Sequence, residues 1–159
     1  MGNKLIKKNI SENIDGVKVT SLKQIRDERG AVFHFLRSDS KTYKGFGESY
    51  FSIVNESVVK GWKYHKEISQ NFCVPYGAIK FVIYDNRANS KTKGNIQEIT
   101  LDDSENYSLI AMPPDLWYSF KCLSNNFAIL SNIIDIPHSI NESISLPLNS
   151  TEIPYVWSE

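Results

Sequence analysis

Lysine and histidine side chains alternate along one short, strand-like run, and these residue types are suited to proton transfer. Residues 58–66 read VVKGWKYHK. Because side chains alternate between the two faces of a strand, Lys63 and His65 are expected on one face, roughly 7 Å apart. A histidine can accept or give a proton near neutral pH, and a neighbouring lysine can polarise a carbonyl or bind a phosphate. The run predicts acid–base chemistry, and the alternative is that His65 only satisfies a polar contact.

The remaining residues do not favour other common catalytic chemistries. A metal site would need several histidines to converge, but His34 and His138 stand in segments unrelated to His65. No Gly-x-Ser-x-Gly nucleophile motif is present, and no glycine-rich phosphate loop leads from a strand into a helix. We therefore expect an enzyme that uses neither a metal nor a cofactor.

Composition narrows the possible partners. Lys and Arg together number 18, as do Asp and Glu, so a net charge of zero provides no field to attract nucleic acid or an anionic membrane. Residues 1–8 lack the apolar core of a signal peptide, and no run approaches the ~20 apolar residues of a membrane span. Cys73 and Cys122 lie in apolar runs and are expected to be buried free thiols. These features predict a cytoplasmic protein.

Short β-rich runs separated by turn residues recur along the chain and predict an all-β sandwich or barrel. The length of 159 residues suits a single domain, residues 1–159. We expect its core at about 15–136, and residues 137–159 as irregular chain held on the barrel by its aromatic end. The candidate strands are residues 17–20, 31–36, 48–54, 58–65, 71–74, 78–84, 96–101, 107–112, 117–123 and 127–133.

Five motifs in a fixed order resemble a known family. The resemblance is to the cupin-fold dTDP-4-keto-6-deoxyglucose (dTDP-4-dehydrorhamnose) 3,5-epimerases, and it runs from about residue 27 to residue 136. The motifs are Asp27-x-Arg29-Gly30, Val59-Lys60-Gly61-Trp62, Gln70, Gly77-x5-Tyr84-Asp85-x-Arg87-x2-Ser90-x-Thr92-x-Gly94, and Met112-Pro113-Pro114-x3-Tyr118-x-Phe120.

The resemblance implies a cupin, or jelly-roll, barrel of two antiparallel sheets, a homodimer and an isomerase without metal. It further implies a role in deoxysugar and O-antigen-type lipopolysaccharide biosynthesis. The implied substrate is a nucleotide-linked 4-keto-6-deoxyhexose carrying dTDP, CDP or GDP. Such enzymes remove a proton next to the C4 carbonyl and return it to the opposite face, usually with a His base and a Tyr acid.

The chain departs from the family pattern at the positions that carry the chemistry. Lys63 stands where the family has its base His, with His65 two residues later, and Ser131-Asn132 stand where its acid Tyr falls. Lys60 replaces the family's Arg, and Tyr118 its later His. We therefore predict inversion of C3, or of C3 and C5.

In this reaction His65 is the predicted base and Tyr118 the opposing acid, while Lys63 polarises the C4 oxygen or shares the base role. The predicted binding residues are Arg29, Lys60 and Lys80 for the diphosphate, Trp62 for stacking on the base or sugar, and Asn132 for a sugar hydroxyl. Core packing is the alternative for Trp62. Two other functions stay open, a 3,4-ketoisomerase of the same nucleotide sugars and a non-catalytic sugar-nucleotide binding protein.

Overall fold

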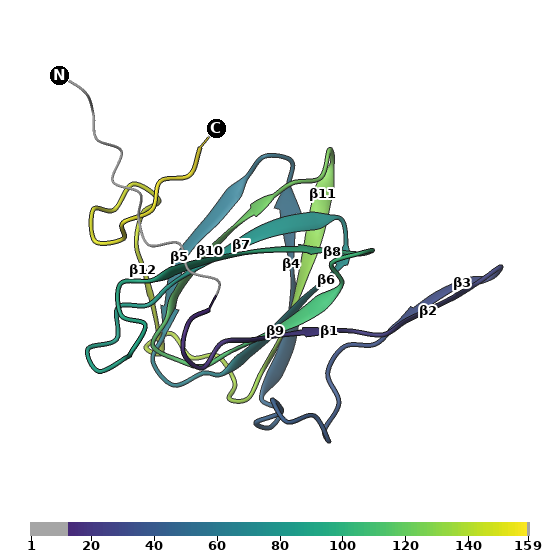
Figure 1. Ribbon diagram of the computed structural model, residues 1–159, viewed down its shortest axis with the longest axis horizontal. Coiled ribbons are helices and arrows are strands. Elements are labelled where there is room, and N and C mark those ends of the chain that lie inside the picture. The colour runs from purple at the N-terminus through teal and green to yellow at the C-terminus, as the bar shows by residue number, and fades with distance from the viewer. Residues whose placement is uncertain (1–12, 159) are drawn as a thin grey trace.

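Two five-stranded antiparallel sheets face each other in the computed structural model, which describes residues 13–158 (Figure 1). Residues 1–8, on which the signal-peptide prediction rests, lie outside the described residues. The strands are β1 (Lys18–Ser21), β2 (Gln24–Asp27), β3 (Gly30–Phe33), β4 (Glu48–Asn55), β5 (Val59–His65), β6 (Gln70–Tyr76), β7 (Ala78–Tyr84), β8 (Ile96–Asp102), β9 (Ser108–Met112), β10 (Trp117–Cys122), β11 (Phe127–Ile134) and β12 (Ser143–Ser145).

The strand order confirms the predicted all-β jelly roll. One sheet, which we call sheet B, has the order β1-β9-β6-β11-β4, and the other, sheet A, has the order β12-β5-β10-β7-β8. The predicted strands are all present, β7 with the predicted bounds and the others with shifted ends, and β2 and β12 are additional. β12 has only three residues, too few to show an alternating pattern, and it exists because it pairs with the edge of β5.

The main core fills the space between the sheets with aromatic and branched side chains. Phe81 packs against both Tyr118 and Phe120, with ring centroids 5.5 and 5.9 Å away. Burying each such side chain contributes about 1.5–3 kcal/mol, so this layer fixes the spacing of the sheets. Cys73 and Cys122 are buried and free, as predicted.

A second, smaller core lies on the outer face of sheet A. There Ile153, Tyr155 and Trp157 from the C-terminal segment pack against Trp62 and its neighbours on β7 and β8. β12 belongs to the same segment and pairs with β5, so part of it is regular strand where we expected only irregular chain. The C-terminal segment thus covers one face of sheet A and adds an edge strand to it.

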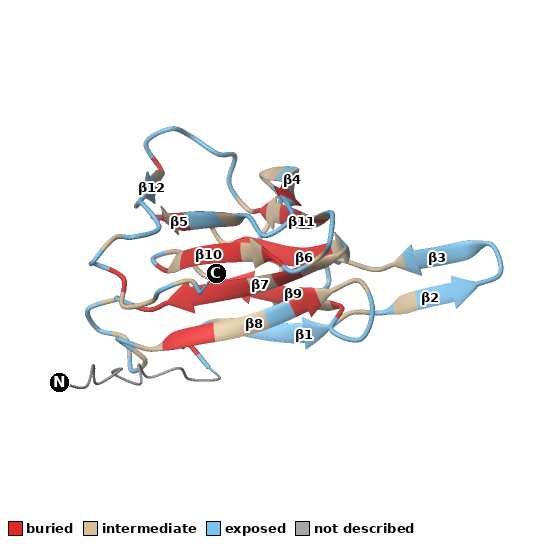
Figure 2. Cartoon of the chain, turned by 90° about the horizontal axis from the view of Figure 1, so that it is seen from above, coloured by how far each residue is buried: buried red, intermediate tan, exposed pale blue. Residues whose placement is uncertain are grey.

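The β2–β3 hairpin extends away from the two sheets, and most of its residues are exposed (Figure 2). Val32 on this hairpin is 60% exposed. None of the elements within residues 13–158 is a helix of the length and apolarity that a membrane span needs.

Candidate active site

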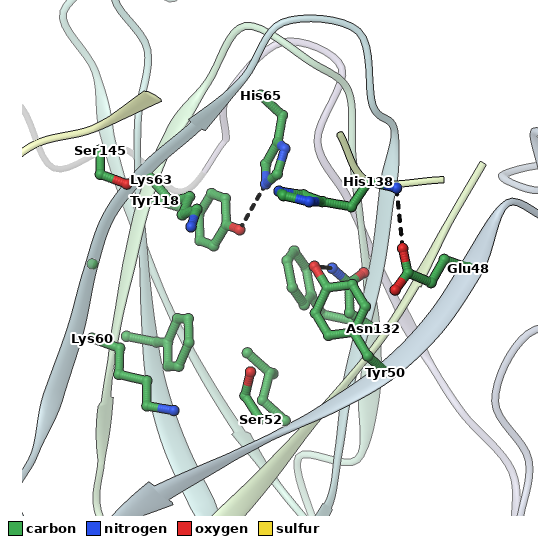
Figure 3. A pocket seen from close by; sticks show the side chains of 14 residues that line it. Glu48, Tyr50, Ser52, Lys60, Lys63, His65, Tyr118, Asn132, His138 and Ser145 are labelled. Atoms are coloured by element: carbon green, nitrogen blue, oxygen red, sulfur yellow. Dashed lines mark hydrogen bonds between the residues drawn. The ribbon is translucent and has the colours of Figure 1, made fainter. Parts of the chain in front are cut away.

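A cavity of about 450 Å³ opens between the two sheets (Figure 3). Its size suits part of a sugar nucleotide, since small-molecule sites run from about 300 to 1,000 Å³. Sheet A contributes residues of β5 and β10 to one wall, and sheet B contributes residues of β4, β6 and β11 to the other. The lining residues are Glu48, Tyr50, Ser52, Lys60, Gly61, Lys63, His65, Phe72, Tyr118, Phe120, Leu130, Asn132, His138 and Ser145.

A bulge in β5 brings an additional lysine into this cavity. Strict alternation would place Lys60 and Lys63 on opposite faces, yet both line the cavity. The register between β10 and β5 shifts here, so that β5 has one residue more than β10. Gly61 makes the bulge possible, because its φ is +153° and a Cβ there would lie 2.2 Å from the Ser119 Oγ.

His65 is held by a carboxylate from the C-terminal segment. Its Nδ1 lies 2.5 Å from the Glu142 Oε2, and the two side chains are 2% and 8% exposed. The other oxygen of Glu142 accepts backbone N–H groups of Glu67 and Ile68 at 3.0 and 3.1 Å. Burial alone would raise the pKa of Glu142, but these donors and His65 outweigh it and leave the pKa lowered. Glu142 is therefore ionised and fixes the imidazole.

This arrangement leaves the second ring nitrogen of His65 as the base. Because Nδ1–H donates to Glu142, Nε2 carries the lone pair when the ring is neutral. Burial lowers the pKa of His65, and the nearby Lys63 and His138 lower it further, although Glu142 acts in the opposite direction. The imidazole is consequently neutral at physiological pH and able to accept a proton.

Tyr118 is the nearest neighbour of that nitrogen. Its hydroxyl donates its proton to the Gln70 Oε1 at 3.1 Å, and its oxygen lies 3.2 Å from the His65 Nε2, where it can accept a hydrogen bond once that nitrogen is protonated. Burial raises the pKa of Tyr118 well above its ordinary value, so the hydroxyl keeps its proton. Tyr118 thus connects the base on sheet A to an amide on sheet B.

A chain of hydrogen bonds continues from Gln70 across sheet B. The Asn132 Nδ2 donates to the Gln70 Oε1 at 3.1 Å and to the Tyr50 hydroxyl at 2.9 Å. The Gln70 Nε2 and the Asn132 Oδ1 are buried without a protein partner. Buried polar atoms are normally hydrogen-bonded, so these two atoms are unsatisfied members of the network beside the cavity.

Five of the eight predicted site residues line this single cavity: His65, Tyr118, Lys63, Lys60 and Asn132.

Two other predicted residues face the opposite side of sheet A. Trp62 is fully buried in the smaller core, 6.0 Å from the ring of Tyr155, so core packing is its role and sugar stacking is not. Lys80 pairs with Glu98 at 2.8 Å and lies over the ring of Trp157. The bulge in β5 explains why Lys60 and Trp62 lie on different faces of sheet A, because it turns Lys60 into the cavity and leaves Trp62 facing outward.

Arg29, the remaining predicted residue, lies on the β2–β3 hairpin. Its guanidinium pairs with Asp27 at 2.6 Å, and its side chain is 82% exposed. It is not among the residues that line the cavity in this chain. Within one chain, Lys60 and Lys63 are therefore the lysines that line the cavity and could contact a diphosphate.

Several residues of the site were not identified from the sequence. Glu142 gave no signal, because it lies in a segment that was expected to be structural. The strand that carries Tyr50 does show a signal in the sequence. Its polar residues Glu48, Tyr50 and Ser52 line the cavity, whereas the apolar residues Phe51 and Ile53 point outward and are 71% and 58% exposed. A strand whose polar side chains face the barrel interior predicts a ligand cavity.

No group of three or more His, Cys, Asp or Glu side chains suited to a metal ion occurs within residues 13–158.

Comparison with known proteins identifies the family. The family model for dTDP-4-dehydrorhamnose 3,5-epimerase matches residues 11–158. The chain is 34% identical over 122 residues to the "Probable low-salt glycan biosynthesis epimerase Agl13" of Haloferax volcanii, covering 76% of this chain and 78% of that one. It is 31% identical over 110 residues to the spore coat polysaccharide biosynthesis protein SpsL of Bacillus subtilis, covering 69% and 72%.

A solved structure agrees with this assignment. The dTDP sugar isomerase of Desulfovibrio desulfuricans G20 superposes with a TM-score of 0.88 at 41% identity, covering 91% of this chain and 92% of that one. The family predicted from the motif order is confirmed, and with it the expectation of a nucleotide-sugar epimerase. The protein belongs to the dTDP-4-dehydrorhamnose 3,5-epimerase family.

Proposed function

We propose that this enzyme inverts C3 of a nucleotide-linked 4-keto-6-deoxyhexose. The observation that carries the proposal is the buried His65, neutral and held by Glu142, with its Nε2 at a cavity that also contains Lys63. His65 takes the proton from C3, and the electron pair of that C–H bond forms the C3–C4 double bond of an enolate. The Lys63 ammonium stabilises the negative charge that develops on the C4 oxygen.

Inversion requires a proton to be returned to the opposite face of C3. The distance between the base and a candidate acid indicates which group can return it. Reacting atoms in a near-attack geometry are about 3–3.5 Å apart, so a base and an acid on opposite faces of one carbon stand about 6–7 Å apart. Tyr118 lies only 3.2 Å from the His65 Nε2, on the same wall. We assign Tyr118 to holding and polarising His65, in place of the opposing-acid role expected from the sequence.

The other groups of the cavity suit the rest of the substrate. Lys60 is exposed at the cavity and provides a cation for the diphosphate of dTDP, CDP or GDP. The unpartnered Asn132 Oδ1 can accept a bond from a sugar hydroxyl. The names of Agl13 and SpsL support a role in building glycans or polysaccharides, and we place this reaction in the cytoplasm.

We also propose that the enzyme works as a homodimer. Phe51 and Ile53 on the outward face of the edge strand β4 are 71% and 58% exposed, which is unusual for apolar side chains that lie close together on one strand face. The protruding hairpin that carries Arg29 offers a further contact surface (Figure 1). Sedimentation equilibrium of the wild type and of Phe51→Ser tests this, and a monomeric wild type would refute it.

The reaction is tested by proton NMR in deuterium oxide with dTDP-, CDP- and GDP-linked 4-keto-6-deoxyhexoses. Loss of the C3 proton signal, with appearance of the C3 epimer, is the expected result. Loss at both C3 and C5 would establish a double epimerase instead. A product with its carbonyl at C3 would identify a 3,4-ketoisomerase, and binding by calorimetry without any exchange would identify a non-catalytic binding protein.

A further inference from the structure

We propose that Tyr50 is the acid that returns the proton to the face of C3 opposite His65. The inference rests on the proposed function, because it names the second partner of the same proton transfer. It differs from the pattern expected for the family, in which the acid Tyr would fall on β11. Here Asn132 occupies that part of β11, and Tyr50 is its direct partner on β4.

Tyr50 lies on the correct wall. His65 and Lys63 project from β5 in sheet A, whereas Tyr50 projects from β4 in sheet B, and both sheets line the cavity. Figure 3 shows Tyr50 and Asn132 on one side of the cavity and Lys63 and Tyr118 on the other. A sugar ring between the two sheets would therefore have the base on one face and the Tyr50 hydroxyl on the other.

The hydroxyl of Tyr50 is arranged to donate a proton. It accepts the Asn132 Nδ2–H at 2.9 Å, and within residues 13–158 its own proton has no acceptor in the protein. Burial raises the pKa of Tyr50, so the group enters the reaction protonated. Asn132 is itself anchored on Gln70, which fixes the orientation of the phenol. Because Tyr50 lines the cavity, the free proton of its hydroxyl can be donated to a ligand bound there.

Other groups at the cavity fit this role less well. Tyr118 is bound to His65, and Lys63 is on the same strand as the base. The ring of His138 lies 6.2 Å from that of His65, in an exposed segment beside the base. Ser52 shares the inward face of β4 with Tyr50, but an aliphatic hydroxyl is a much weaker acid than a phenol.

The step balances without any further reactant. The enolate carbon takes the proton of the Tyr50 hydroxyl, a C3–H bond forms on the new face, and the C4 ketone is restored. Tyr50 is left as a phenolate, which the Asn132 Nδ2–H stabilises by a charge-assisted hydrogen bond. Water at the open mouth of the cavity then reprotonates it, while His65 releases its own proton to solvent.

The decisive experiment follows exchange and inversion separately in deuterium oxide, using Tyr50→Phe and the substrate that the wild type epimerises. His65 can still remove the C3 proton and return a deuteron to the same face. We expect C3 exchange within a few-fold of wild type and formation of the epimer slowed by at least about 10²-fold, the usual contribution of an acid. The control is Tyr76→Phe, which removes the hydroxyl of a residue that is 47% exposed on β6 and does not line the cavity.

A second variant tests the role of Tyr50 even if Tyr50→Phe misfolds. Replacing Tyr50 by 3-fluorotyrosine keeps the shape and lowers the phenol pKa, so the fall of the epimerisation rate at high pH should move to lower pH, while exchange should not.

Inversion by Tyr50→Phe at a near wild-type rate would overturn the assignment. It would also be overturned if the high-pH limb of the epimerisation rate did not move in the 3-fluorotyrosine variant. Loss of exchange together with inversion, in a variant that still binds dTDP, would place Tyr50 on the abstraction side. If the wild type itself exchanges no proton on any substrate, the proposed function fails first, which separates the two failures.

Discussion

Two clusters of buried and partly buried polar side chains in this molecule are built in contrasting ways. The cavity cluster consists of His65, Tyr118, Gln70, Asn132 and Tyr50, and the Asp85 cluster consists of Asp85, Arg87, Ser90 and Thr92. In the Asp85 cluster both carboxylate oxygens are filled. The Oδ1 accepts the N–H and Nε–H of Arg87, each at 3.0 Å, and the Oδ2 accepts the Ser90 and Thr92 hydroxyls, each at 2.6 Å, and the Arg87 Nη2 at 2.9 Å.

The cavity cluster leaves polar atoms without protein partners, the Gln70 Nε2 and the Asn132 Oδ1. A filled cluster stabilises the loop that it closes, whereas an unfilled one beside a cavity is ready for a ligand. The residues that match the family pattern most fully, from Tyr84 to Gly94, form the filled cluster. The residues that depart from it, Lys60, Lys63 and Tyr118, lie at the cavity. The likeness to the family is thus strongest in the scaffold, and the differences lie in the chemistry.

The largest expected effect comes from removing the base in the cavity cluster. His65→Asn should slow C3 exchange by about 10³-fold, since general-base catalysis contributes 10²–10⁴-fold. The free energy of unfolding should change by no more than about 1 kcal/mol, because backbone donors still hold Glu142. NMR exchange and urea denaturation measure the two quantities. Turnover within a few-fold of wild type would remove His65 from the base role and make Lys63 the first candidate.

In the Asp85 cluster we expect the opposite result, a large loss of stability with little change in rate. Asp85→Asn should lower the free energy of unfolding by about 3 kcal/mol, because it leaves the half-buried Arg87 without its counter-charge. The rate per folded molecule should stay within a few-fold of wild type. Urea denaturation and active-site titration provide these values. A large loss of rate in a folded protein would show that the Asp85 cluster also serves the chemistry.

The same cluster should give the stability a defined dependence on pH. Burial alone would raise the pKa of Asp85, but Arg87, Ser90 and Thr92 outweigh it and hold the pKa well below the ordinary value of 3.8. The stabilisation is therefore complete above pH 3.8 and is lost as the pH falls below it, where the unfolded chain binds the proton more readily. Wild type should lose more stability than Asp85→Asn between pH 5 and pH 2. Parallel curves would contradict the role of the carboxylate.

A smaller effect is expected at Glu142, which acts through His65. Glu142→Gln should lower the rate about tenfold, at the lower end of the 10–100-fold loss that follows removal of the carboxylate behind a metal-binding histidine. The carboxylate raises the pKa of His65, so its loss should move the low-pH limb of kcat/KM to still lower pH. The matched control is Glu67→Gln, a change at an exposed side chain. A lower rate with an unmoved limb would mean that Glu142 is only structural.

The smallest effect is expected outside both clusters. Lys80→Met removes a partly exposed ion pair with Glu98, and such pairs contribute about 0–1 kcal/mol. Neither the KM for the nucleotide sugar nor kcat should change. The position of Lys80 on the outer face of sheet A indicates that it does not bind the diphosphate. A rise in KM of tenfold or more would show that it does.

The fold was predictable because alternating β-rich runs and ordered motifs are local signals. β12 was not, since three residues acquire strand geometry only by pairing with β5. His65 and Lys63 were found from strand alternation. Alternation alone does not turn Lys60 inward, because that depends on the Gly61 bulge, and the close approach of Ser119 to the bulge is a tertiary contact.

Glu142 was not predictable, because its role depends on a contact across 77 positions of the chain.

That long-range contact makes the chemistry depend on a segment outside the main strands. A chain that lost residues 137–158 would keep β1 to β11, yet its His65 would lack the carboxylate that orients the ring and keeps Nδ1 protonated. Tyr155 and Trp157 hold the same segment on the outer face of sheet A. Proteolytic removal of this segment would therefore disable the base while leaving β4, β5, β6, β10 and β11 uncut.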